Sequence, residues 1–256
     1  MPELGDVLLL CLAAGFAGWV DAVSGGGGLV QIPALLILLP GASPAQVLAT
    51  NKLSSICGTS VSATTYYRRV RPDLRTALPM AGIALVGAAL GALCASVISA
   101  DVFRPLVLVL VVVVGAYVLL HPGVGEEQSL RWEGRRHHIA AGAGGLGLGF
   151  YDGIFGPGTG SFLVILLVGL LGYSFLQASA KARIVNLATN LGALLIFAAQ
   201  GAPLWRLGLL MGACNVAGSW LGAHTAIRRG SGFVRVVFLV VVAALAVRLA
   251  YDIVRG

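Results

Sequence analysis

The chain has 256 residues, of which 58% are hydrophobic and only 11% are charged, and its mean hydropathy is +0.93. A soluble domain of this size cannot bury so much apolar surface, so the composition excludes a soluble globular protein and predicts a polytopic membrane protein. The net charge of +7 comes from arginines in short loops beside apolar segments, which indicates membrane topology and argues against a nucleic-acid partner.

Apolar segments follow one another along the chain with short polar connections, and we expect each of them to be helical. They cover about residues 7–39, 47–66, 76–98, 102–120, 139–173, 179–199, 207–227 and 233–251. Glycines interrupt the first and the fifth of these segments. The longest polar interval, 121–138, is too short to be a soluble domain. The sequence therefore predicts an all-α polytopic membrane protein.

The chain consists of two copies of a four-segment unit. A shift of 131 residues places Asp21 on Asp152, and it places GAALGA at 87–92 on GSWLGA at 218–223. The same shift, without gaps, serves from about residue 18 to residue 106. We therefore assign a first membrane repeat to 1–120, a cytoplasmic loop to 121–138 and a second membrane repeat to 139–256.

The two interruptions occupy matching places in the repeats, as VDAVSGGGGLVQIP at 20–33 and YDGIFGPGTGSFL at 151–163. In the first repeat, the interruption separates two arms, at 8–20 and 29–39. These arms are roughly 16–20 Å long at about 1.5 Å per residue. Each arm is shorter than the ~30 Å hydrocarbon core. Each repeat therefore opens either with one broken, tilted span or with a re-entrant helix pair. Paired interruptions of this kind indicate a transporter binding site.

The arginines favour the re-entrant alternative. If both interrupted segments return to their starting side, each repeat crosses the membrane three times and the two repeats are inverted. The arginine-bearing loops 67–75, 121–138 and 228–235 then all lie on the cytoplasmic side. If the interrupted segments cross instead, 228–235 lies on the opposite side from 67–75. The positive-inside rule prefers the inverted arrangement.

Residues that suit an anion gather at the interruptions and in the segments that follow them. A glycine-rich turn leaves free N–H groups at a helix start, where the dipole is positive. Only two lysines occur in the chain, Lys52 and Lys181, and the shift pairs Lys52 with Arg183 unless two residues are gapped. Close helix packing of the glycines and snorkelling of the lysines to the interface are the alternatives. The candidate substrate-binding residues are Thr50, Asn51, Lys52, Gly26, Gly27, Gly28, Gly158, Thr159, Lys181, Arg183 and Asn186.

Asp21 and Asp152 are candidates for gating or for handling protons, because an acid inside a membrane segment is costly and usually faces a cavity or a partner. The alternative is that each caps the helical arm that follows it. The sequence contains no GxSxG or HExxH motif, and its cysteines and histidines have no spacing that suits a metal. We therefore predict neither an enzyme nor a cofactor.

With these residues in view, the chain resembles the TauE/SafE family of sulfite exporters and organosulfur-anion permeases. The resemblance rests on GFAGWVDAVSGGGGLVQIPALL at 15–36, ATNKLSS at 49–55, GLGFYDGIFGPGTGSFL at 147–163 and KARIVNLATNLGALLIFAAQG at 181–201. It implies a multi-pass protein of the bacterial inner membrane that moves sulfite, sulfoacetate or related sulfonates. The second glycine-rich stretch departs from the family pattern with Pro157. Because the family is diverse, the resemblance does not identify the substrate of this chain.

The resulting hypothesis is a secondary transporter that exports small sulfur-containing oxyanions. An interior that is negative by 100 mV favours the exit of each negative charge by about 2.3 kcal/mol, so an exporter needs no coupling ion, and the two aspartates then shape the tips without loading protons. An anion channel of the same fold and a proton-coupled importer are the alternatives. The expected partners are a small anion and the lipid bilayer, and the sequence leaves open whether the chain forms a homo-oligomer.

Overall fold

The computed structural model describes residues 3–95 and 127–255, and over these residues the chain is helical with no strand. The predicted segment at 102–120 lies outside the described residues. The helices are α1 (Leu4–Ser24), α2 (Gly28–Leu38), α3 (Pro44–Val70), α4 (Leu74–Cys94), α6 (Gly134–Ile154), α7 (Thr159–Ile165), the π-helix η1 (Leu166–Leu170), α8 (Phe175–Ala199) and α9 (Trp205–Arg255). By length and composition, α1, α4 and α8 can each cross a membrane.

Equivalent residues start α3 and α8, the helices that follow the two interrupted segments. Ser43 accepts a hydrogen bond from the backbone N–H of Gln46, and the Gln46 side chain accepts one from the N–H of Ser43, which makes a capping box at the start of α3. Ser174 accepts in the same way from the N–H of Gln177 at the start of α8. These two caps are equivalent, because the 131-residue shift places Ser43 on Ser174 and Gln46 on Gln177.

The first interruption is a turn between two helices that pack against each other, and the break comes at the glycines. Asp21 and Ser24 remain inside α1, and Gly25 ends the helix with a φ of 91°. The first arm is thus longer than predicted, because α1 has 21 residues and α2 has 11, about 31 Å and about 16 Å of helix. Leu10 of α1 shares a core cluster with Leu35 of α2, so α2 returns along α1.

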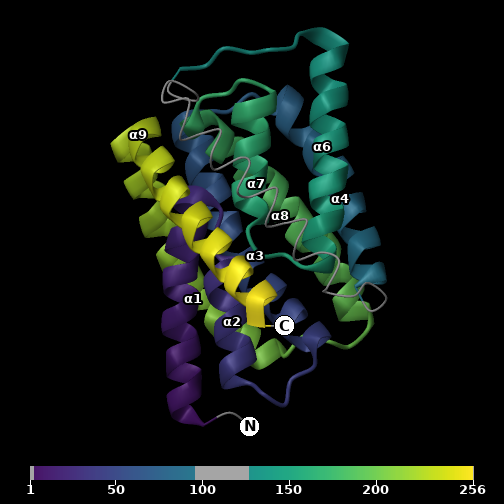
Figure 1. Ribbon diagram of the computed structural model, residues 1–256, viewed down its shortest axis with the longest axis vertical. Coiled ribbons are helices and arrows are strands. Elements are labelled where there is room, and N and C mark those ends of the chain that lie inside the picture. The colour runs from purple at the N-terminus through teal and green to yellow at the C-terminus, as the bar shows by residue number, and fades with distance from the viewer. Residues whose placement is uncertain (1–2, 96–126, 256) are drawn as a thin grey trace.

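The second interruption has the same form and starts from the other end of the molecule. The N–H of Ser129 donates to the carbonyl of Gly172 over 2.9 Å, so the chain after η1 has returned to the start of α6. Figure 1 shows α1 rising from the end that holds the N-terminus, whereas α6 descends from the opposite end. The helix α6 begins at Gly134, before the predicted boundary at 139.

Each repeat packs on the other through small residues at equivalent places. A Cβ at Gly218 in α9 would overlap with the backbone oxygen of Gly15 in α1, and a Cβ at Gly87 in α4 would overlap with the backbone oxygen of Leu146 in α6. The shift converts the first contact into the second. The motifs GAALGA and GSWLGA therefore bring helices from different repeats into close backbone contact, as small residues do in membrane proteins.

The arginine-bearing connections come together at one end of the molecule. The side chain of Gln177 donates to the carbonyl of Val70 over 3.5 Å, and the N–H of Leu176 donates to the hydroxyl of Ser231 over 3.3 Å. Thr76 lies 3.3 Å from His137 in the same region. At the opposite end, the Thr50 hydroxyl accepts from the N–H of Leu204.

The predicted segments 207–227 and 233–251 correspond to two helices that meet at a kink at Gly230, and both lie within α9. This glycine has a φ of 74° and a ψ of −170°, which are not helical values. A glycine adopts this conformation at little cost, so the chain bends here without a longer loop.

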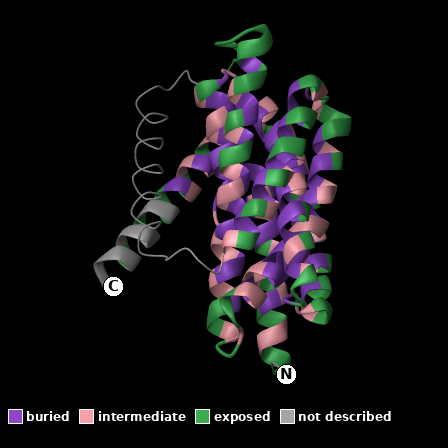
Figure 2. Ribbon diagram, turned by 90° about the vertical axis from the view of Figure 1, so that its right-hand side faces the viewer, coloured by how far each residue is buried: buried purple, intermediate pink, exposed green. Residues whose placement is uncertain are grey.

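Buried residues follow the inner faces of the helices and exposed residues the outer faces (Figure 2). The outer faces carry large apolar side chains, among them Leu12, Phe16, Leu90 and Leu195, each about half exposed or more. Polar side chains gather inside, including Lys52, Asp152, Lys181 and Arg183. An apolar outside with buried charges inside is the arrangement expected in a bilayer.

Candidate functional site

Each interrupted segment forms a helical hairpin, α1–α2 in the first repeat and α6–α7 in the second. The glycine-rich turns are the tips of these hairpins, and the two tips meet inside the molecule. The N–H of Ser161 donates to the carbonyl of Gly25 over 3.2 Å, and the Ser161 hydroxyl donates to the carbonyl of Ser24 over 2.9 Å. A Cβ at Gly25 would overlap with the backbone of Gly160. The two interruptions of the sequence therefore form one structural feature, and glycine is required there by the close approach of two backbones.

Two ion pairs connect the repeats beside these tips. Lys52 of α3 lies with its Nζ atom 2.6 Å from Oδ2 of Asp152 in α6. Arg183 of α8 lies with its Nη1 atom 2.7 Å from Oδ2 of Asp21 in α1, and it also donates to the Asp21 carbonyl. The 131-residue shift converts one pair into the other, so each cation of one repeat holds the aspartate of the other repeat.

These charges are almost completely withdrawn from solvent. The side chains of Lys52 and Asp152 are each 2% exposed, Arg183 is 0% exposed, and Asp21 is 14% exposed. Ion pairs at such depth persist only when their partners compensate one another, because an uncompensated buried charge is strongly destabilising. The two cations and two anions have a formal net charge of zero.

A cavity of about 20 Å³ lies between the tips and the ion pairs, and this volume is enough for about one water molecule. Its lining is polar and includes repeat-equivalent residues, such as Asp21 with Asp152, Gly25 with Gly156, and Ser55 with Asn186. The complete lining is Asp21, Gly25, Gly28, Asn51, Lys52, Ser55, Asp152, Gly156, Gly160, Asn186 and Asn190.

Several of the predicted site residues lie at this cavity and others lie elsewhere. Lys52, Asn51, Gly28 and Asn186 line it, together with both aspartates. The predicted residues that do not line it are Thr50, Gly26, Gly27, Gly158, Thr159, Lys181 and Arg183. Thr50 contacts Leu204, Gly26 faces Val241, and the Thr159 hydroxyl donates to the Gly156 carbonyl over 3.0 Å. The N–H of Gly27 donates to Asp21 over 3.4 Å, so this glycine holds a lining residue in place.

Arg183, and not Lys181, is the structural equivalent of Lys52. The Nζ atom of Lys181 donates to the carbonyl of Asp73 over 2.7 Å and lies 4.5 Å from the centre of the Tyr173 ring. Partial burial raises the pKa of Asp73, but hydrogen bonds from the Arg75 N–H and the Thr76 hydroxyl, together with Lys181, bring it below its ordinary value. Lys181 thus belongs to the arginine-bearing end, and the ungapped shift gives the correct partner of Lys52.

The cavity is also lined by residues that were not predicted from the sequence, namely Ser55, Asn190, Gly25, Gly156 and Gly160. Two signals would have found most of them. The 131-residue shift leads from Asn186 to Ser55 and from Gly25 to Gly156. The spacing of four residues, which keeps side chains on one helix face, leads from Asn186 to Asn190 and from Asn51 to Ser55.

Arg183 presents one edge of its guanidinium group without a partner. Its Nη1 atom holds Asp21, whereas Nε and Nη2 are buried and have no hydrogen-bond partner among the described residues. The Nη2 atom lies 2.7 Å from the position that a Cβ of Gly160 would occupy, and Gly160 lines the cavity. An Nε–Nη2 edge is the face with which arginine binds two oxygens of a carboxylate, phosphate or sulfonate.

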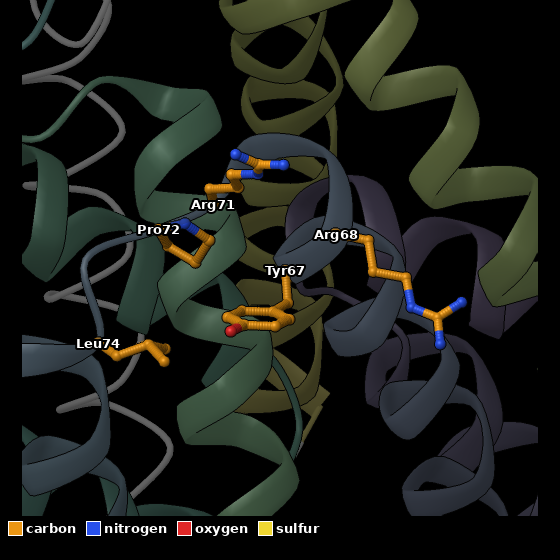
Figure 3. Close-up of a pocket in the computed structure, with 5 residues that line it drawn as sticks. All are labelled: Tyr67, Arg68, Arg71, Pro72 and Leu74. Atoms are coloured by element: carbon orange, nitrogen blue, oxygen red, sulfur yellow. The ribbon is translucent and has the colours of Figure 1, made fainter.

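A larger cavity of about 570 Å³ opens at the arginine-bearing end and is lined by Tyr67, Arg68, Arg71, Pro72 and Leu74. Figure 3 shows that the Arg68 side chain extends away from the Arg71 side chain, so the two guanidinium groups do not converge. We therefore place the candidate site at the hairpin tips. Over residues 3–95 and 127–255, no three His, Cys, Asp or Glu side chains are grouped as a metal site would require.

Comparison with known proteins gives a consistent result. Residues 10–249 match the family described as "Sulfite exporter TauE/SafE". A probable membrane transporter protein, ORF9, of Sinorhizobium sp is 37% identical over 98% of this chain and 96% of its own length. The probable membrane transporter protein YfcA of Escherichia coli K12 is 38% identical over 95% of this chain and 89% of its own length. A probable membrane transporter protein of Haemophilus influenzae is 35% identical over 96% of both chains.

No solved structure matches the chain. The family match covers both hairpin tips, both ion pairs and every residue that lines the cavity at the tips. The relatives that resemble it over nearly their whole length are all described as membrane transporters. The chain therefore belongs to the TauE/SafE family of membrane transporters.

Proposed function

We propose that this membrane transporter carries small sulfur-containing oxyanions, such as sulfite or organosulfonates, across the bacterial inner membrane. The observation that supports the proposal best is the pair of buried cations, Lys52 and Arg183, which two equivalent helices bring beside the hairpin tips. Two cations at this depth are costly, and such residues in membrane segments usually serve the substrate pathway. The name of the family supports the sulfur oxyanion as the class of substrate.

In the proposed binding mode the two cations contribute different chemistry: Lys52 lines the cavity, and Arg183 lies beside Gly160, which lines it. Lys52 supplies a compact positive charge, and the free edge of Arg183 supplies two parallel N–H groups. Asn51, Asn186 and Asn190 supply amide groups that can turn to either end of a polar ligand. A cavity of about 20 Å³ is too small for an oxyanion, so the tips must separate when the anion binds.

The direction of transport depends on whether the anion moves alone. An anion that moves alone is driven outward by the membrane potential, and this is the basis for predicting export. A carrier that takes a proton with each anion works as an importer. Both alternatives use the same site, and the arrangement of the four buried charges favours the proton-coupled one, as argued below.

The substrate class can be tested on the purified protein by its melting temperature. We expect sulfite, thiosulfate or sulfoacetate to raise the melting temperature, because a ligand that binds only the folded state stabilises it by mass action, by about 2.7 kcal/mol at 100 times its dissociation constant. Sulfate and taurine, tested alongside, define the selectivity, and chloride at equal ionic strength is the control. If none of the five compounds has an effect beyond that of chloride, the proposed substrate class is wrong.

The topology makes a separate prediction. After replacement of the four native cysteines, single cysteines at positions 71, 132 and 228 should all react with a membrane-impermeant reagent from the cytoplasmic side. A cysteine at position 42 or 201 should react from the opposite side, because these connections lie at the other end of the molecule. Labelling of positions 71 and 228 from opposite sides would exclude the inverted arrangement.

A further inference from the structure

We propose that each anion binds together with a proton, and that Asp152 is the residue that accepts this proton. The inference rests on the proposed function, since it concerns the same site. It adds the coupling ion and the residue that carries it. It also turns the direction of net transport from export to uptake, because an inward proton gradient then drives the anion into the cell.

The charge of the site supports a proton that enters with the anion. Lys52 and Arg183 are already balanced by Asp152 and Asp21, so the four buried groups have a formal net charge of zero before an anion arrives. An anion that entered alone would leave a buried site with a net negative charge, which is strongly unfavourable at low dielectric. A proton that enters with a monoanion restores the balance.

The small size of the cavity brings the anion into contact with the existing ion pair. The cavity holds about 20 Å³, and the side chains that line it include both carboxylates. An oxyanion that enters between the separated tips meets an ammonium that already holds Asp152 at 2.6 Å, so the anion and the carboxylate compete for Nζ. In the proposed exchange, the oxygens of the anion replace the carboxylate oxygen there. Asp152 then loses the one charged partner that the described residues give it.

The two aspartates are not equivalent in this exchange. Arg183 holds Asp21 through Nη1, and its free Nε–Nη2 edge can bind an oxyanion without releasing that aspartate. Asp21 also accepts from the N–H of Gly27 and is 14% exposed, so it remains compensated as a carboxylate. Asp152 is 2% exposed and depends on Lys52. The proton that accompanies the anion therefore goes to Asp152.

The other titratable groups near these charges do not take this role. Tyr151 precedes Asp152 in α6, and its hydroxyl donates to the Pro157 carbonyl over 2.6 Å. Tyr66 of α3 lies near Asp21 and Arg183, and its hydroxyl donates to the Ala22 carbonyl over 2.9 Å. A phenol that already donates its proton is not a proton acceptor. The helices α2 and α7, which form the tips, contain no titratable residue, and α4 meets this part of α6 through alanine and glycine.

The coupling has a direct thermodynamic signature. If one proton binds with each anion, protons strengthen anion binding as much as the anion strengthens proton binding. Anion affinity should then fall with rising pH, by up to about tenfold per pH unit. The probe must not titrate itself and must carry one negative charge, so methanesulfonate and ethanesulfonate, the monoanions of strong acids, are suitable.

The experiment compares the wild type with Asp152→Asn and with the repeat-equivalent Asp21→Asn, by titration calorimetry between about pH 5 and about pH 8. In the wild type we expect the affinity for both probes to fall with pH. In Asp152→Asn we expect no dependence on pH and, near pH 8, tighter binding than in the wild type, because Lys52 is already free of a carboxylate. Asp21→Asn should keep the pH dependence. The same pH dependence in Asp152→Asn as in the wild type would overturn the assignment.

A transport measurement on the wild type keeps the proposal testable if Asp152→Asn does not fold. In proteoliposomes with the potential clamped at zero, an acidic exterior should drive methanesulfonate to accumulate, whereas a potential without a pH gradient should not. Accumulation driven by the potential alone would contradict coupling. If the wild type binds neither probe at any pH, the proposed function itself fails, which is distinct from binding that is independent of pH.

Discussion

Loss of the Lys52 ammonium is expected to abolish anion binding, with a decrease in affinity on the order of 100-fold. Lys52→Met keeps most of the aliphatic stem and removes the charge. The substitution also leaves the Asp152 carboxylate buried without its partner, at a cost of roughly 3–5 kcal/mol in folding stability. We therefore expect a lower melting temperature as well as a loss of affinity for sulfite and thiosulfate.

The double variant Lys52→Met/Asp152→Asn separates binding from folding. It removes both charges of one ion pair, so most of the lost melting temperature should return, whereas anion binding should not. Lys181→Met is the matched control, because Lys181 is buried at the start of the equivalent helix but contacts Asp73 and Tyr173 instead of the cavity. Retained affinity in the double variant, or a loss in Lys181→Met as large as in Lys52→Met, would reassign the binding lysine.

The sequence was sufficient to predict the helical class and the approximate position of every described helix, because apolar segments in a membrane protein are long and their polar connections are short. It placed the end of the first arm too early, at Val20. The first arm was predicted to stop before Asp21, but Arg183, 162 residues away, compensates the charge of Asp21 and the helix continues to Ser24. A contact between residues so distant in the sequence cannot be read from local composition.

The candidate site could be predicted only in part for a similar reason. The 131-residue shift aligns Lys52 with Arg183 and Asp21 with Asp152, so it identifies which residues are equivalent. It does not show that each cation pairs with the aspartate of the other repeat, because that depends on how the two repeats pack together. Without this pairing, the charge of the site before an anion binds could not be predicted. The structure shows a site that is already neutral.

The remaining prediction concerns the contact between the hairpin tips. Gly25 has a φ of 91°, a conformation that costs an alanine roughly 1–2 kcal/mol, and an added Cβ would overlap with the backbone of Gly160. Gly25→Ala should therefore push the tips apart, lower the melting temperature and weaken binding of sulfite or thiosulfate, since Arg183 Nη2 lies beside Gly160. Gly82→Ala in α4 is the control, because no atom lies within 4 Å of its added Cβ and alanine favours a helix. If Gly25→Ala behaves like Gly82→Ala in both measurements, the contact between the tips does not shape the site.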